Sequence, residues 1–262
     1  MAESATHLLQ TAPGVRLWLA PEVAEAENAA EWLQRGEQLL EQRAAEANAV
    51  IGGGRHQTRR VLLGDQAGHV DPNASGWHGV WRINRHGGLL GSVQGDRYRT
   101  PTRLQAEIEL SEALRSRGIA TPRVLLALAV KHGLSWRQHL ITEEVAGAVT
   151  VFDARKDQEA LTAADQLLQR LCDVGLWATD LHPGNMLWQA AELTAETANS
   201  AHPTATGRGA SRCWVIDLAG AKLLPNPLNP EQRLARRRRF ARFFAKHGGE
   251  VPPLFADASA GK

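Results

Sequence analysis

Apolar residues recur every three or four positions in several parts of the chain, a period typical of amphipathic helices. The first such part is rich in alanine and glutamate, with a proline suited to its first turn. The last is strongly basic and ends in two glycines. The pattern predicts helices over residues 21–49, 102–117, about 157–175 and 228–249.

Short runs rich in aliphatic, β-branched and aromatic residues separate these helices, and turn-forming residues bound them, as expected of strands. The first four runs predict antiparallel strands, and the last predicts a buried strand that ends in an acid. The alanine-, threonine- and serine-rich residues 189–211 predict an exposed loop. The strand-like runs are T-R-R-V-L-L-G, H-G-V-W-R-I-N-R, V-L-L-A-L-A-V, S-W-R-Q-H-L-I-T-E-E and C-W-V-I-D.

This order of elements favours an α+β fold with two lobes. We expect a small antiparallel sheet with one prominent helix in a first lobe at residues 1–145. A second, mainly helical lobe is expected at residues 146–262. A chain of 262 residues is long enough for two such lobes.

Composition narrows the class of protein. The chain is 43% apolar and 22% charged, which is ordinary for a globular protein. Its net charge of +2 gives no support to a nucleic-acid partner. The N-terminal sequence predicts no signal peptide, and no run approaches the ~20 apolar residues of a membrane span, so we expect a soluble or peripheral protein. Cys172 and Cys213 are expected to be buried free thiols. Nothing in the sequence indicates an oligomeric state.

Polar residues are concentrated in A-T-D-L-H-P-G-N-M-L-W, at residues 178–188. Asp180 and Asn185 have the D-x-x-x-x-N spacing of a kinase-type catalytic loop, which offers a carboxylate to a substrate hydroxyl and an amide oxygen to magnesium. Asp217 follows a strand-like run, where it can supply a second oxygen ligand. The pattern therefore predicts Asp180 as catalytic base and Asn185 and Asp217 as ligands of Mg²⁺.

The first half of the chain contains the other expected parts of a phosphate site. Gly52, Gly53 and Gly54 form a loop suited to lie over phosphates. Arg82 lies in a strand where a kinase has its phosphate-binding lysine, and Glu107 lies on the next helix, where the partner of that lysine belongs. Every cation before Lys131 is arginine, which can also contact phosphate.

Several segments together identify a family. The segment 78–98, H-G-V-W-R-I-N-R-H-G-G-L-L-G-S-V-Q-G-D-R-Y, resembles bacterial 3-deoxy-D-manno-octulosonic acid (Kdo) kinases of the lipopolysaccharide kinase family. The resemblance continues through L-I-T-E-E-V-A-G-A, D-L-H-P-G-N-M-L-W and V-I-D-L-A-G-A and covers roughly residues 50–247. The chain departs from it at Ala178-Thr179 and at the Leu-Ala that follows Asp217.

The resemblance implies a protein-kinase-like fold and transfer of the γ-phosphate of ATP, with Mg²⁺, to a Kdo hydroxyl of lipopolysaccharide. It implies the roles already given for Asp180, Asn185 and Asp217, with Arg82 on phosphate and Glu107 as its partner. The implied partner is Kdo-lipid A or a related core glycolipid. The implied location is the cytoplasmic face of the bacterial inner membrane, as a peripheral protein on an anionic surface.

Alternatives stay open at this stage. One is a soluble phosphotransferase of the aminoglycoside or choline kind, and another is a pseudokinase that binds a partner without catalysis. The sequence does not decide between Kdo and heptose as the acceptor. The basic run Arg236–Arg239 is compatible with a solvated helix face, with contact to anionic glycolipid or membrane, and with nucleic acid. His182 is expected to order the loop rather than to act as an acid or base.

Overall fold

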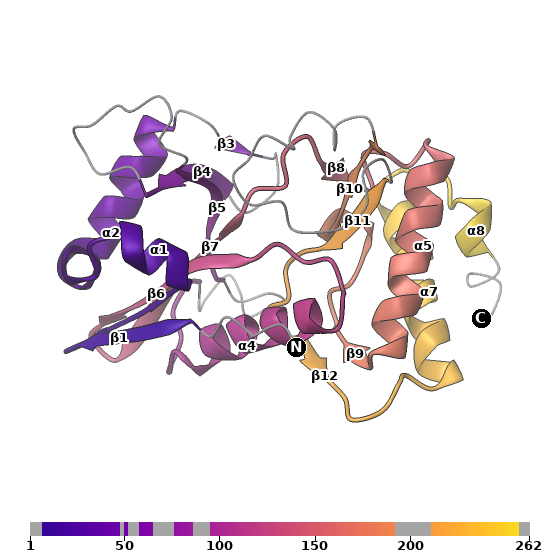
Figure 1. Ribbon diagram of the computed structural model, residues 1–262. Helices are drawn as coiled ribbons and strands as arrows, with labels where there is room; N and C mark the ends of the chain where they lie inside the picture. The colour runs from indigo at the N-terminus through magenta and orange to yellow at the C-terminus, as the bar shows by residue number, and fades with distance from the viewer. Residues whose placement is uncertain are drawn as a thin grey trace. The chain divides into compact units, whose positions relative to one another are not determined.

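The computed structural model describes residues 7–47, 50–51, 58–64, 76–85, 95–191 and 211–256. The chain forms two compact units, and each is considered by itself (Figure 1). The first unit contains residues 1–112 and 123–144, and the second contains 113–122 and 145–262. The predicted α+β class is confirmed, because the first unit holds an antiparallel sheet and the second has several helices.

The first unit is built on a sheet in the strand order β1-β2-β6-β7-β5-β4-β3, in which every neighbouring pair is antiparallel. The β6–β7 connection is a tight turn, since His132 pairs with Ser135 and Gly133 has a φ of 61°. The four antiparallel strands expected from the sequence are present. The strands are β1 Leu8–Ala12, β2 Val15–Leu19, β3 Val50–Ile51, β4 Thr58–Leu63, β5 Trp77–Ile83, β6 Val124–His132 and β7 Ser135–Glu143.

Helices cover both faces of this sheet (Figure 1). Helices α1, Pro21–Ala26, and α2, Ala29–Glu46, pack on one face, where the core includes Leu17 and Trp81. Helix α4, Thr102–Ser116, packs on the other, against a core that includes Trp18. Successive side chains of a strand point to opposite faces, so Trp81 faces α2 whereas its neighbour Arg82 contacts α4.

The prediction of a single helix over residues 21–49 is wrong. The chain forms two helices there, with Glu27 as the C-cap of α1 and Asn28 as the N-cap of α2. The Asn28 side chain accepts hydrogen bonds from the backbone N–H groups of Ala30 and Glu31. These bonds satisfy donors at the start of the second helix, and this favours a new helix over continuation of the first.

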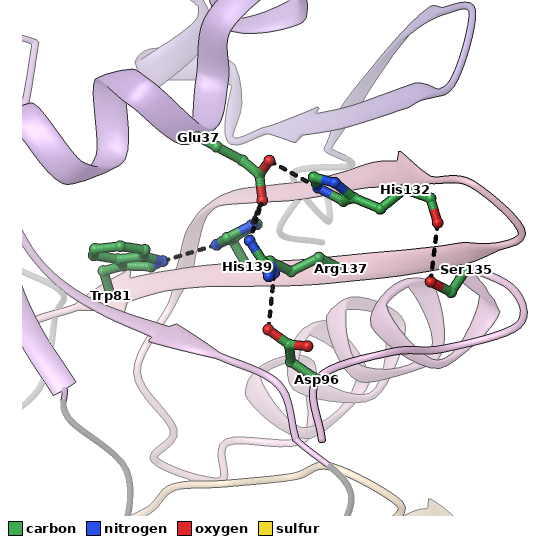
Figure 2. A network of polar contacts seen from close by, with 7 residues as sticks. All are labelled: Glu37, Trp81, Asp96, His132, Ser135, Arg137 and His139. Atoms are coloured by element: carbon green, nitrogen blue, oxygen red, sulfur yellow. Dashed lines mark hydrogen bonds and ion pairs between the residues drawn. The ribbon is translucent and has the colours of Figure 1, made fainter. Parts of the chain in front are cut away.

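A polar network joins α2 to the β6–β7 hairpin (Figure 2). The Glu37 carboxylate accepts hydrogen bonds from the Nε2 atoms of His132 and His139, each at 2.9 Å, and from Arg137 at 3.4 Å. Trp81 Nε1 donates to His139 Nδ1 at 3.3 Å, so the proton of this buried imidazole is on the nitrogen that faces Glu37. The hydrogen bond from His139, followed by the positive charges of the network, lowers the pKa of Glu37 from 4.5 to about 2 despite burial.

The lowered pKa of Glu37 predicts a dependence of stability on pH. An ionised group with a depressed pKa stabilises the fold above its unfolded value of 4.5, and this contribution is lost as the pH falls toward 2. The shift corresponds to roughly 3 kcal/mol. Because the Glu37 side chain is 25% exposed, we expect solvent screening to reduce this to about 1–2 kcal/mol. Glu37→Gln should lower the free energy of unfolding by that amount at neutral pH, as measured by urea unfolding.

The difference between Glu37→Gln and the wild type should shrink as the pH is lowered from 4.5 toward 2. Glutamine can still accept the hydrogen bond from His139, so the comparison isolates the charge. A difference that stays constant over this range would show that the charge of Glu37 does not stabilise the unit.

In its described residues, the second unit combines helices with two small sheets. Helix α5 is capped by the Asp157 side chain, and α7 begins with a capping box between Asn229 and Gln232. The helices are α5 Gln158–Asp173, α7 Pro230–Lys246 and α8 Pro253–Ala256. The β11-β10-β8 sheet consists of β8 Val149–Thr150, β10 Met186–Gln189 and β11 Arg212–Val215, and the β12-β9 sheet of β9 Leu176–Trp177 and β12 Lys222–Leu223.

The core of the second unit contains the buried rings of Phe240, Phe244 and Phe255. Cys172 and Cys213 are buried free thiols, as predicted, and burial raises the pKa of Cys213 to about 12. Most of the predicted loop 189–211 lies outside the described residues. Within the described part of the chain, no helix combines the length and apolar character that a membrane crossing requires.

Candidate active site

The predicted catalytic loop lies between strands β9 and β10 and is tightly folded. It ends in a short 3₁₀ helix, η1 Pro183–Asn185, which begins with proline. His182 caps this helix, because its Nδ1 atom accepts a hydrogen bond from the Gly184 N–H at 3.1 Å. The Asn185 N–H donates to the His182 carbonyl at 2.8 Å. These local bonds fix the path of the chain between Asp180 and Asn185.

The structure brings Asp180 and Asn185 together. The Asn185 Nδ2 atom donates a hydrogen bond to the backbone carbonyl of Asp180 at 2.8 Å. The amide nitrogen is therefore engaged, and this orientation leaves the amide oxygen, Oδ1, as the group that can bind a cation. The Asp180 side chain is 58% exposed, so a substrate can reach it.

Asp217 is placed beside this loop by the sheet of the second unit. Strand β10 pairs with β11, with Met186 opposite Val215. The Ile216 N–H then donates to the Asn185 carbonyl at 3.0 Å, so Asp217 follows a residue that is bonded to Asn185. The predicted order of loop, strand, turn, strand and acid thus brings two oxygen-bearing side chains to neighbouring backbone positions.

Asp217 also has an unusual backbone conformation. Its φ is 56°, and among the described residues it is the only non-glycine residue with a positive φ. This left-handed region is costly for most side chains and is tolerated best by glycine, asparagine and aspartate. Such strain is often retained at functional sites.

The conformation of Asp217 predicts the effect of two substitutions on stability. Asparagine tolerates left-handed φ, so Asp217→Asn should leave the free energy of unfolding within about 0.5 kcal/mol of wild type. Valine is β-branched, and Asp217→Val should cost about 1–3 kcal/mol in thermal or urea unfolding. Equal stability of the two variants would mean that the backbone at this position is not strained.

The residues at this site fit a magnesium ion. Mg²⁺ prefers hard oxygen ligands and often takes only one or two from protein, with phosphates and water completing its shell. The amide oxygen of Asn185 and the carboxylate of Asp217 would supply such ligands. Among the described residues, no group of three or more His, Cys, Asp and Glu side chains is arranged to hold a metal ion.

The first unit contains the predicted pair of Arg82 and Glu107. A guanidinium nitrogen of Arg82 forms an ion pair with Glu107, whose side chain is 4% exposed. Arg82 also donates to Asn84 Oδ1 at 2.6 Å. The Nδ2 atom of Asn84 in turn donates to Oε2 of Glu107 at 3.4 Å. The predicted ion pair between Arg82 and Glu107 is present, and contact of Arg82 with phosphate stays a prediction. Gly52, Gly53 and Gly54 lie outside the described residues.

Residues 41–226 match the lipopolysaccharide kinase (Kdo/WaaP) family. This match spans more than half of the chain. The chain belongs to the lipopolysaccharide kinase (Kdo/WaaP) family. The family resemblance of the sequence is therefore confirmed.

Curated relatives named 3-deoxy-D-manno-octulosonic acid kinase match part of the chain. The Haemophilus influenzae (strain 86-028NP) protein is 29% identical over 154 residues, which are 54% of this chain and 57% of the relative. The Xylella fastidiosa (strain M12) protein is 28% identical over 171 residues, which are 62% of this chain and 61% of the relative. The match thus spans less than two thirds of each relative.

Two of the solved structures that are similar to this member of the Kdo/WaaP family have low sequence identity to it. One is WaaP in complex with acyl carrier protein, with a TM-score of 0.48, 16% identity, and coverage of 93% of this chain and 86% of that chain. The other is the ADP/Mg²⁺-phosphoaspartate complex of Rio2 kinase from Chaetomium thermophilum, with a TM-score of 0.46, 18% identity, and coverage of 87% and 66%.

Residues of α7 contact the predicted catalytic loop, and the sequence did not reveal this role. Arg239 forms an ion pair with Asp180, at 2.5 Å from Nη2 to Oδ1. Arg236 donates to the Ala178 carbonyl, and its guanidinium lies 4.5 Å from the ring centroid of Trp177. The solvated-face interpretation is wrong for Arg236, which is 8% exposed. The i, i+3 spacing of the two arginines is the sequence signal that could have indicated a shared face.

His182 is held between the loop and α7. Its ring stacks on Phe243 with centroids 4.1 Å apart and an interplanar angle of 12°. Burial lowers the pKa of His182 below its ordinary 6.5, although Asp180 acts in the opposite direction. Since Nδ1 accepts from Gly184, the proton of the neutral ring is on Nε2, which lies 3.7 Å from Asp180 Oδ1. These contacts favour an ordering role for His182.

Proposed function

We propose that the chain is an ATP- and Mg²⁺-dependent kinase that phosphorylates a hydroxyl of Kdo in the lipid A–core region of lipopolysaccharide. The observation that carries the proposal is the arrangement of Asp180, Asn185 and Asp217 around one short loop of the second unit. Membership in the lipopolysaccharide kinase (Kdo/WaaP) family and the names of its relatives support the choice of acceptor.

In the proposed reaction, Asp180 acts on the acceptor hydroxyl. A carboxylate oxygen accepts the hydroxyl proton as the acceptor oxygen bonds to the γ-phosphorus, and the bond between that phosphorus and the bridging oxygen of ADP breaks. General-base assistance of this kind contributes typically about 10²–10⁴-fold to rate. Most of the remaining catalysis in phosphoryl transfer comes from positioning and electrostatic stabilisation.

The other site residues would bind the nucleotide and its metal. Asn185 and Asp217 would hold Mg²⁺, which supplies charge neutralisation on the phosphates when it is bound. Arg82 would contact phosphate oxygens through its planar guanidinium, while Glu107 and Asn84 hold that group in place. The glycines at 52–54 are proposed to cover the phosphates, as expected from the sequence.

We further propose that the chain acts as a peripheral protein at the cytoplasmic face of the inner membrane, because its acceptor is a glycolipid. The basic helix α7 supports contact with an anionic surface, although Arg236, Arg237 and Arg239 each make contacts inside the second unit. Contact with the membrane would therefore depend on the exposed charges of the helix, such as Arg242.

The proposal is tested by offering several acceptors together with γ-labelled ATP and Mg²⁺. Kdo-bearing lipid A, an aminoglycoside and choline would be incubated separately with the wild-type protein and with Asp180→Asn. We expect label in the glycolipid, none in the soluble acceptors, and loss of transfer in the variant. Label in the aminoglycoside or choline alone would replace the proposal with a soluble phosphotransferase, and no transfer with any acceptor would favour a pseudokinase.

A further inference from the structure

Helix α7 presents one continuous face to the catalytic loop. Arg236, Arg239 and Phe243 follow each other at spacings of three and four residues, which places them on the same side of a helix. Each contacts a different part of the segment from Trp177, at the end of β9, to His182 in the loop. The loop is therefore held from outside by a single rigid element as well as by its own hydrogen bonds.

The two ends of this face make structural contacts. Arg236 is almost fully buried, donates to the Ala178 carbonyl and lies over the Trp177 ring. Phe243 stacks on His182, which caps η1. These contacts fix the backbone before and after Asp180 and do not touch its carboxylate.

Arg239, between them, contacts the proposed base itself. Its Nη2 atom donates to Oδ1 of Asp180, and the Nε2 atom of His182 lies 3.7 Å from the same oxygen. Among the described residues, no hydrogen bond reaches the other carboxylate oxygen, Oδ2. One oxygen is thus directed toward α7, while the other is available to a substrate.

We propose that Arg239 is a positioning residue for phosphate transfer. By holding Oδ1, it sets the rotation of the Asp180 carboxylate so that Oδ2 is presented to the acceptor hydroxyl. This inference rests on the proposed role of Asp180 as base. Orientation of this kind matters because a reacting group displaced by about 1 Å can lose about 10²-fold in rate.

The test compares Arg239→Ala, Arg239→Lys and the matched control Arg233→Ala, which removes an arginine of the same helix that is paired with a different aspartate, Asp173. Transfer of γ-phosphate to Kdo-bearing lipid A would be measured as kcat and as KM for ATP. We expect Arg239→Ala to lower kcat about 10–100-fold with KM for ATP unchanged. Lysine should restore part of kcat, because the contact uses a single nitrogen. Arg233→Ala should resemble the wild type.

Chemical rescue separates positioning from a general structural effect. Methylguanidinium added to Arg239→Ala should raise kcat, because it can occupy the vacated site beside Asp180, and it should not rescue Asp180→Asn. If Arg239→Ala does not fold, as judged by its melting temperature, Arg239→Gln replaces it in the measurements of kcat and of KM for ATP.

Outcomes for the inference and for the proposed function are distinguishable. If Asp180→Asn is inactive while Arg239→Ala keeps or exceeds the wild-type kcat, Arg239 does not position the base and the inference is overturned. A loss of kcat that neither lysine nor methylguanidinium relieves would also overturn it. If Asp180→Asn itself retains full activity, the proposed function fails first.

Discussion

Replacing Asp180 by asparagine is expected to lower kcat for phosphate transfer by about 10²–10⁴-fold. Asparagine has nearly the same shape, but its amide cannot accept the proton of the acceptor hydroxyl. The loop should keep its fold, because Asn185 bonds to the backbone carbonyl of residue 180 and α7 holds Ala178 and His182. Steady-state kinetics at saturating ATP would measure the loss, and the melting temperature would verify folding.

A matched control for Asp180→Asn is Asp173→Asn. Asp173 is also an exposed aspartate of the second unit that is paired with an arginine of α7, Arg233, at 2.8 Å. Exposed ion pairs of this kind contribute little, about 0–1 kcal/mol, so both variants should remain folded. Only the change at Asp180 should affect kcat. Equal activity of both variants would remove Asp180 from the mechanism.

Replacing Arg82 by methionine is expected to have the largest effect on stability. Glu107 is 4% exposed and Arg82 is 20% exposed, so the variant removes one partner of a largely buried ion pair. Removal of one partner from a buried ion pair typically costs about 3–5 kcal/mol. Because Asn84 still lies near Glu107 and Arg82 is partly exposed, we expect a loss near the lower value, about 3 kcal/mol, in urea unfolding.

The double variant Arg82→Met/Glu107→Leu separates folding from function. An apolar pair of similar volume can replace a buried ion pair with little loss of stability, so this variant should recover most of the unfolding free energy. It should not recover use of ATP, since the cation that is proposed to bind phosphate is missing. Arg82→Lys, which keeps the charge, should retain part of the activity. Full activity of the double variant would exclude Arg82 from ATP binding.

The sequence predicted most elements, because their signals are local. The period of residues 157–175 predicted α5, and short apolar runs bounded by turn-forming residues predicted β6 and β7. The break between α1 and α2 was missed, although Asn28 followed three residues later by Glu31 has the form of a capping signal. The apolar period of a helix continues across Asn28 in the sequence, but the side-chain cap of Asn28 starts a new helix there.

The candidate site was only partly readable from the sequence. The spacing of Asp180 and Asn185 and the strand before Asp217 predicted residues that the fold brings together. The contacts of Arg236 and Arg239 were not predictable, because a run of arginines has the same sequence pattern whether its side chains meet solvent, lipid or a neighbouring carboxylate. Only the packing of α7 against the loop reveals which of them are engaged.

The most direct measurement is transfer of labelled γ-phosphate to Kdo-bearing lipid A, compared with the same lipid A without Kdo. Mass spectrometry of the hydrolysed product would locate the phosphate. We predict label on the Kdo unit with wild-type protein and Mg²⁺, and none with lipid A alone or with Asp180→Asn. Absence of label on Kdo in the presence of folded wild-type protein, or equal labelling by Asp180→Asn, would contradict the proposed function.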